Sequence, residues 1–97
     1  MKIRHIVLHT PGPNWQPGVS FREQPGVRQH VEHYAGLQAA GKLYAGGPFL
    51  EDDLGGMMVA TENVGRDELE AFAAADPAVQ SGLLNYEVRG WYIAMSA

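Results

Sequence analysis

The sequence predicts an α+β fold with the element order β-α-β-β-α-β. Short runs rich in β-branched or aromatic residues lie near both ends of the chain, at residues 2–9 and 81–95. Between them, two stretches carry apolar residues at helical spacing and flank a pair of shorter strand-like segments. The 97 residues suffice for one hydrophobic core, so we expect a single domain over residues 1–97.

The first helix is expected from about Pro25 to Gly41, because proline suits a first helical turn and glycine suits a C-terminal cap. The apolar residues at helical spacing predict its buried stripe, formed by Val27, Val31, Tyr34 and Leu37. His30 falls on this stripe and His33 toward its flank, so the two histidines are not equivalent.

A hairpin is expected next, from strands at residues 42–50 and 56–62 joined by a turn at 51–56. Gly46 and Gly47 in the first of these strands indicate a bulge or a close approach of the backbone to another group.

The second helix is expected to start at residues 63–65 and to end near Asp76, which precedes Pro77. Leu69, Phe72 and Ala73 face inward, and Asp76 continues that series by helical spacing. Asp76 therefore has two readings. It caps a following turn that has Pro77 at its first position, or it also meets an inward side chain of the first helix, since a carboxylate has two oxygens.

This element order is the ferredoxin-like arrangement, an antiparallel sheet with both helices on one face. The other face would be left bare, and a small domain has little other means of covering apolar surface. We therefore expect a homodimer.

Composition excludes several classes of function. The net charge is −4 and the seven Lys and Arg residues are scattered, which argues against nucleic-acid binding. The chain has no cysteine, which suits a reducing, cytoplasmic setting. No segment approaches the roughly 20 apolar residues of a membrane span. No phosphate loop or dinucleotide fingerprint is present, so we expect no cofactor and neither phosphoryl nor hydride transfer.

His30 and Asp76 are the candidate catalytic residues, because a carboxylate beside an imidazole orients it and raises its basicity for general acid/base work. The alternative is an ordinary hydrogen-bonded core histidine. A metal pair formed by His30 and His33 would need further ligands. His5 and His9 share a strand face and could complete such a site, but nothing else in the sequence supports it, so we expect no metal.

The segment 10–24 carries three prolines and two glycines and is expected to be a loop that holds Trp15 and Phe21. These rings either seal the core edge or roof a substrate pocket. Gly46 and Gly47 would let a substrate approach the backbone closely. Arg89, on the last strand, would either hold a substrate carboxylate or pair with a neighbouring acid.

The chain resembles the YCII family. The resemblance rests on a helical histidine, His30, eleven residues before a Gly-Lys pair, then "AGGP" at 45–48, then "ADP" at 75–77 with a following glycine. It implies a ferredoxin-like monomer that pairs into a dimeric α+β barrel, with His30 and Asp76 at the family's proposed active site. His33 has no such counterpart, and one branch of the family dehydrochlorinates a chlorinated hydroxyquinol.

Two functions follow as hypotheses. The first is a small enzyme in which His30 and Asp76 carry out elimination or isomerisation on a small substrate, with aromatic rings among the candidates. The second is a non-catalytic dimer that binds a small ligand or serves as an accessory module, with His30 and Asp76 forming a structural hydrogen bond.

Overall fold

The computed structural model describes residues 2–51 and 53–97. Its elements are, in chain order, β1 (Lys2–Pro11), the 3₁₀-helix η1 (Phe21–Glu23), α1 (Val27–Ala39), β2 (Leu43–Pro48), β3 (Gly56–Ala60), α2 (Arg66–Ala74), α3 (Pro77–Gln80) and β4 (Leu84–Ile93). The expected succession of strands and helices is present, with two short helices added. The protein is therefore a small α+β fold.

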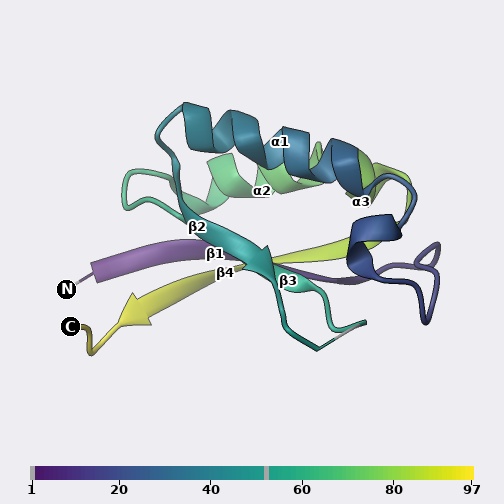
Figure 1. Cartoon of the computed structure of the whole chain (residues 1–97). Coiled ribbons are helices and arrows are strands. Elements are labelled where there is room, and N and C mark those ends of the chain that lie inside the picture. Colours follow the sequence, from purple (N-terminus) through teal and green to yellow (C-terminus); the bar gives the residue numbers. More distant parts are fainter. Residues whose placement is uncertain (1, 52) are drawn as a thin grey trace.

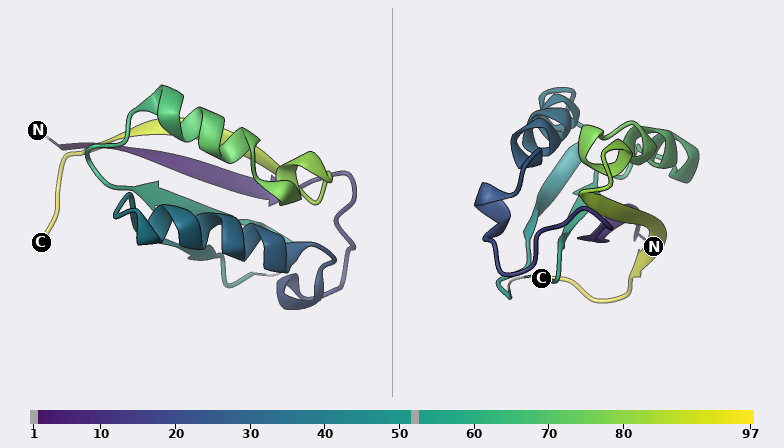
Figure 2. Two further views of the ribbon diagram at one scale, coloured as in Figure 1. Left: turned by 90° about the horizontal axis from the view of Figure 1, so that it is seen from above. Right: turned by 90° about the vertical axis from the view of Figure 1, so that its right-hand side faces the viewer.

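The four strands form one antiparallel sheet in the order β2-β3-β1-β4. Both long helices lie on the same face of this sheet, and the two chain ends lie at one end of the molecule (Figure 1). Seen from above, α1 lies over β2, while α2 lies over β1 and β4 (Figure 2). The core lies between these two layers, and its fully enclosed residues include Val7, Leu69 and Ala73.

Side-chain alternation on β1 decides which groups enter the space beneath the helices. Val7 and His9 point toward the helices and are 0% and 2% exposed. Ile6 and Leu8 point to the opposite face, where they pair with Val59 and Met57 of β3. The side chain of His9 therefore points from the sheet into the interior.

Helix α1 begins later than the proline predicts. Gly26 has a φ of 96°, a left-handed conformation that the helix cannot include, so the first helical residue is Val27. At the other end Gly41 has a φ of 74°, and the amides of Gly41 and Lys42 donate to the carbonyls of Gln38 and Leu37. This pattern is a Schellman motif, so the predicted glycine cap is confirmed.

The prediction that Val31 belongs to the buried stripe of α1 is wrong. Val31 is 59% exposed, whereas His30, Tyr34 and Leu37 are buried. The inward face of α1 is narrower than the apolar pattern suggests, because only the side of the helix next to α2 and the sheet is covered.

The hairpin of β2 and β3 is present, but its irregularity lies between Leu43 and Ala45 rather than at the Gly46–Gly47 pair. A close approach does occur at Gly46, where a Cβ atom would lie 2.2 Å from the sulfur of Met58. The predicted turn at 51–56 includes residue 52, which lies outside the described residues.

The long loop before α1 is organised by one buried amide. Gln24 is 2% exposed, and its side chain accepts from the amide of Gln16 and donates to the carbonyls of Gln16 and Val19. Trp15 donates through Nε1 to Oδ1 of Asp53, 2.6 Å away, which ties the loop to the turn between β2 and β3. The loop therefore has a defined position over one end of α1.

Across the described ranges, the helices are all too short or too polar to cross a membrane.

Replacing Gln24 with Ala removes three hydrogen bonds that order the loop. We expect the free energy of unfolding to fall by about 1–3 kcal/mol, measured by urea denaturation. Amide exchange at residues 15–21 should speed up at the same time. The matched control is Gln29→Ala, at an exposed position of α1. Equal stability and equal loop exchange in both variants would contradict this role of Gln24.

Candidate active site

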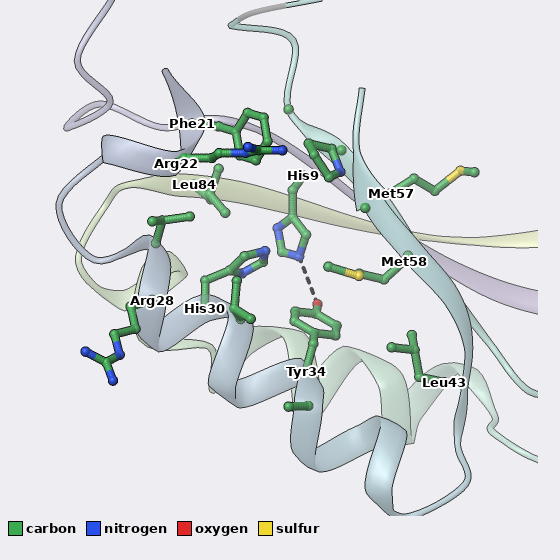
Figure 3. Close-up of a pocket in the computed structure, with 18 of the residues that line it drawn as sticks. His9, Phe21, Arg22, Arg28, His30, Tyr34, Leu43, Met57, Met58 and Leu84 are labelled. Atoms are coloured by element: carbon green, nitrogen blue, oxygen red, sulfur yellow. Dashed lines mark hydrogen bonds between the residues drawn. The ribbon is translucent and has the colours of Figure 1, made fainter. Parts of the chain in front are cut away.

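A cavity of about 540 Å³ opens between α1, η1 and the β2–β3 hairpin. Figure 3 shows His9, His30 and Tyr34 gathered at its inner wall, with Phe21 and Arg22 on one side and Met58 on the other. Most of the remaining lining is aliphatic, aromatic or glycine backbone, contributed by Trp15, Val27, Val31, Ala35, Leu43, Gly46, Gly47, Pro48, Gly55, Gly56 and Leu84. The cavity is a largely apolar site with a few polar groups at one wall.

Asp76 is a fully buried charged group, with 0% of its surface exposed. It stands immediately before α3, where Pro77 occupies the first turn, and its Oδ1 accepts from the amide of Ala78 at 2.9 Å. Its Oδ2 lies 2.6 Å from Nδ1 of His30. The capping reading is thus confirmed, and the same carboxylate also meets the histidine.

Two opposing effects act on the Asp76 carboxyl. Burial by itself raises its pKa, but the hydrogen bonds from His30 and from the Ala78 amide outweigh burial and hold the pKa below its ordinary value. The group is therefore a carboxylate at neutral pH and accepts at both oxygens. It follows that Nδ1 of His30 carries a hydrogen and donates it to Oδ2.

With Nδ1 bonded to Asp76, Nε2 is the nitrogen of His30 that remains available to a substrate. The ring is 9% exposed and lines the cavity, and Nε2 lies on the side of the ring away from Nδ1. Asp76 fixes the orientation of the ring. An imidazole held in this way both takes up and returns protons at Nε2.

A second polar pair, which the sequence pattern did not assign to the site, lies beside the first. Nε2 of His9 is 2.8 Å from the hydroxyl of Tyr34, and Nδ1 of His9 is 3.1 Å from the backbone carbonyl of Asn85. The His9 ring centroid is 5.0 Å from that of His30. Inward alternation on β1 signalled His9, while Tyr34 resembled an ordinary core residue.

The environment gives this pair its own charge state. Burial, together with the neighbouring His30, lowers the pKa of His9 to about 4, so its ring is neutral at pH 7. Burial and the charge of Asp76 raise the pKa of Tyr34 well above its ordinary value, so Tyr34 remains a phenol.

His9, His30 and Asp76 also present possible metal-ligating atoms within 4.8 Å of one another. Both nitrogens of His9 and both oxygens of Asp76 already have hydrogen-bond partners. A metal would have to displace several of these bonds. The donors suit a hydrogen-bond network better than a metal centre, and the expectation of no metal stays a prediction.

Comparison with known families identifies the family of this chain. Residues 3–92 match the family described as the YCII-related domain. The chain belongs to the YCII-related domain family. No curated protein matches this YCII-related domain.

A solved structure gives a similar fold. It is the 5-chloro-2-hydroxyhydroquinone dehydrochlorinase TftG from Burkholderia phenoliruptrix AC1100, in complex with 2,5-dihydroxybenzoquinone. The two proteins share 24% sequence identity over 91% of this chain and 93% of the other, with a TM-score of 0.57.

The cavity of the YCII-related domain brings together most of the residues predicted for its site. Trp15, Phe21, Gly46 and Gly47 all line the cavity that His30 faces. Their roles in binding substrate, and those of His30 and Asp76 in catalysis, stay predictions. The structure adds that the loop before α1, helix α1 and the β2–β3 hairpin all line one cavity.

Arg89 lies elsewhere, and its predicted place in the pocket is wrong. It is next to Val88, which faces the helices, so its own side chain points to the opposite face of the sheet. There its guanidinium pairs with Glu87 at 2.6 Å, which is the alternative that the sequence allowed. Because both side chains are more than half exposed, this pair adds little stability.

His33 also lies outside the site. Its Nε2 donates to the carbonyl of Phe72 at 2.7 Å, and its ring stacks on the Phe72 ring at 3.9 Å between centroids. His33 thus joins α1 to α2, while His30, one turn earlier, faces the cavity.

The charge state of His9 predicts a pH dependence of stability. A folded-state pKa of about 4 against an ordinary 6.5 means that protons bind the unfolded chain more tightly. The contribution is complete above pH 6.5 and is lost as pH falls toward 4, by about 3 kcal/mol in total. The lowered pKa of Asp76 adds a separate loss only below its ordinary value of 3.8.

Urea denaturation between pH 7.5 and 4 measures this dependence. In His9→Gln the slope between pH 6.5 and 4 should shrink, because the titrating ring is gone. Parallel profiles for wild type and variant would show that His9 is not the group responsible.

Proposed function

We propose that this protein is a small enzyme in which Nε2 of His30 acts as a general base and acid on a flat, largely apolar substrate. The observation that carries the proposal is the 2.6 Å contact between His30 and the fully buried Asp76 at the wall of a cavity. A buried carboxylate is costly, and one held against a cavity-facing imidazole is an arrangement suited to proton transfer.

The proposed chemistry is elimination or isomerisation. Nε2 takes a proton from a substrate carbon, and the electron pair left behind forms a new double bond. In an elimination a leaving group departs with its bonding pair; in an isomerisation His30 returns the proton to a different carbon. Asp76 stabilises the imidazolium in both cases, without taking the proton itself.

An aromatic or quinonoid substrate suits the lining. Trp15 and Phe21 offer aromatic rings, and Met58 is an adaptable apolar group. The similarly folded enzyme TftG is a dehydrochlorinase of 5-chloro-2-hydroxyhydroquinone. That activity is an elimination on a small hydroxylated ring, and it supports the same class of reaction here.

We also propose a ferredoxin-like assignment and a homodimer joined through the bare sheet faces as an α+β barrel. The face opposite the helices carries Ile6, Leu8 and Met57, and Trp91 on the same face is 45% exposed. A second copy is the natural cover for such a surface. The absence of cysteine from the sequence suits a cytoplasmic setting.

A second candidate is a ligand-binding module without catalysis. The observation in its favour is that Asp76 caps α3, so the His30–Asp76 bond has a structural use independent of any reaction. The cavity would then hold a small ligand that His30 contacts but does not transform.

His30→Gln separates the two candidates. Chloride release from 5-chloro-2-hydroxyhydroquinone is a suitable first assay, and we expect turnover to fall about 100-fold or more because the general base is lost. The matched control is His33→Gln, one turn along the same helix, which should keep wild-type turnover. Turnover of His30→Gln within about threefold of wild type would favour the binding module over acid/base catalysis.

The two glycines of β2 offer a test of the cavity wall. In Gly46→Ala the new methyl group collides with the Met58 sulfur and pushes that side chain toward the cavity. We expect ligand affinity to fall about tenfold, with stability changed by less than about 1 kcal/mol. Gly47→Ala is the control, since a Cβ atom there meets nothing within 4 Å. If both variants bind alike, the Gly46 wall is not part of the binding site.

A further inference from the structure

The pair formed by His9 and Tyr34 has a defined hydrogen-bond direction. The Asn85 carbonyl can only accept, so Nδ1 of His9, 3.1 Å away, carries the hydrogen. In a neutral ring Nε2 is then a lone pair, and the Tyr34 hydroxyl, 2.8 Å away, must donate to it. The hydrogen of Tyr34 is therefore committed to His9.

The neutral state of His9 is what sets this direction. A charged ring would donate from both nitrogens and would release the Tyr34 hydrogen for other partners. The ring is 2% exposed and lies 5.0 Å from the His30 ring, between centroids, so burial and the neighbouring His30 both disfavour the charged form.

Tyr34 consequently presents lone pairs, not a hydrogen, to the cavity that it lines. Figure 3 shows its oxygen directed toward His9 across the inner wall, next to His30. The phenol does not ionise at neutral pH, because burial and the nearby Asp76 charge oppose it. The oxygen is a fixed acceptor, and the Tyr34 ring lies beside that of His30, with 5.2 Å between ring centroids.

We infer that Tyr34 is a specificity-determining residue. It selects substrates that carry a neutral O–H or N–H group next to the position attacked by His30. His9 is the positioning residue that keeps Tyr34 a hydrogen-bond acceptor toward the cavity. This inference rests on the proposed function, because it concerns the same cavity. It extends that function from a small apolar ring to one carrying a hydrogen-bond donor at a defined place.

Because the Tyr34 hydroxyl donates to His9, substrate groups without a hydrogen to donate are disfavoured beside the Tyr34 oxygen. A ketone or ether oxygen there would face the lone pairs of Tyr34, and an oxyanion would in addition face the negative charge of Asp76. A buried acceptor left without a donor costs binding free energy, so discrimination is built into the wall. Protonated hydroxyl forms of a ring should bind in preference to keto or ionised forms.

The alternative is that Tyr34 only satisfies His9 within the core. Both readings predict the Tyr34–His9 bond, but they differ in ligand selectivity. A purely structural tyrosine leaves the preference between a hydroxyl and a methoxyl group unchanged when its oxygen is removed.

The test uses guaiacol and veratrole, two neutral rings that differ in one O–H donor. Chemical-shift titration of the wild type at pH 7 should show guaiacol binding about fivefold tighter than veratrole. In Tyr34→Phe this ratio should fall below about twofold, because the acceptor is gone. His33→Gln, which lies outside the cavity, should keep the wild-type ratio.

A second readout needs no variant and no ligand. The ¹⁵N shifts of the His9 ring in the wild type should show a neutral imidazole protonated at Nδ1. A ring protonated at Nε2, or a charged ring at pH 7, would overturn the inference even if Tyr34→Phe failed to fold.

The outcomes separate the inference from the function on which it rests. Binding of both rings without preference, or with the same preference in Tyr34→Phe, would overturn the inference and leave the proposed function standing. Failure of both rings to bind at the cavity would count against the proposed aromatic site and would overturn the inference with it.

Discussion

The buried carboxylate of Asp76 is the constraint on which the site depends. A charge with no solvent exposure must be compensated, and both of its oxygens are occupied, one by the Ala78 amide and one by His30. The first bond starts α3, and the second joins α3 to α1. Asp76 thus caps α3, joins α3 to α1 and orients the ring of His30. The interaction that joins these helices is also the one that assembles the site.

Two histidines 5.0 Å apart between ring centroids have different hydrogen-bond partners. Nδ1 of His30 meets the carboxylate of Asp76. His9 faces a backbone carbonyl and a phenol in a buried position, which keeps it neutral. The wall therefore places a histidine paired with a carboxylate beside a neutral histidine that accepts from Tyr34. Such a division between neighbouring side chains follows from environment rather than residue type.

Much of the fold and half of the candidate site could be predicted from local pattern. The strand and helix order, the Gly41 cap and the inward direction of His30 and Asp76 all follow from periodicity and turn chemistry, and these depend on near neighbours along the chain. The Val31 and Arg89 assignments failed for a different reason. Which side of a helix is covered, and which face of a strand meets a cavity, depend on segments distant in sequence.

By itself the sequence determined the order of the main strands and helices, the likeness to the YCII family and the choice of His30 and Asp76 as candidates, because each rests on short-range patterns or fixed spacing. Only the tertiary structure decided that His9 of the first strand and Tyr34 of the first helix share one hydrogen bond. These residues are 25 positions apart and meet only when α1 packs on the sheet. The direction of that bond depends in turn on Asn85, 76 positions from His9, and no local pattern carries that information.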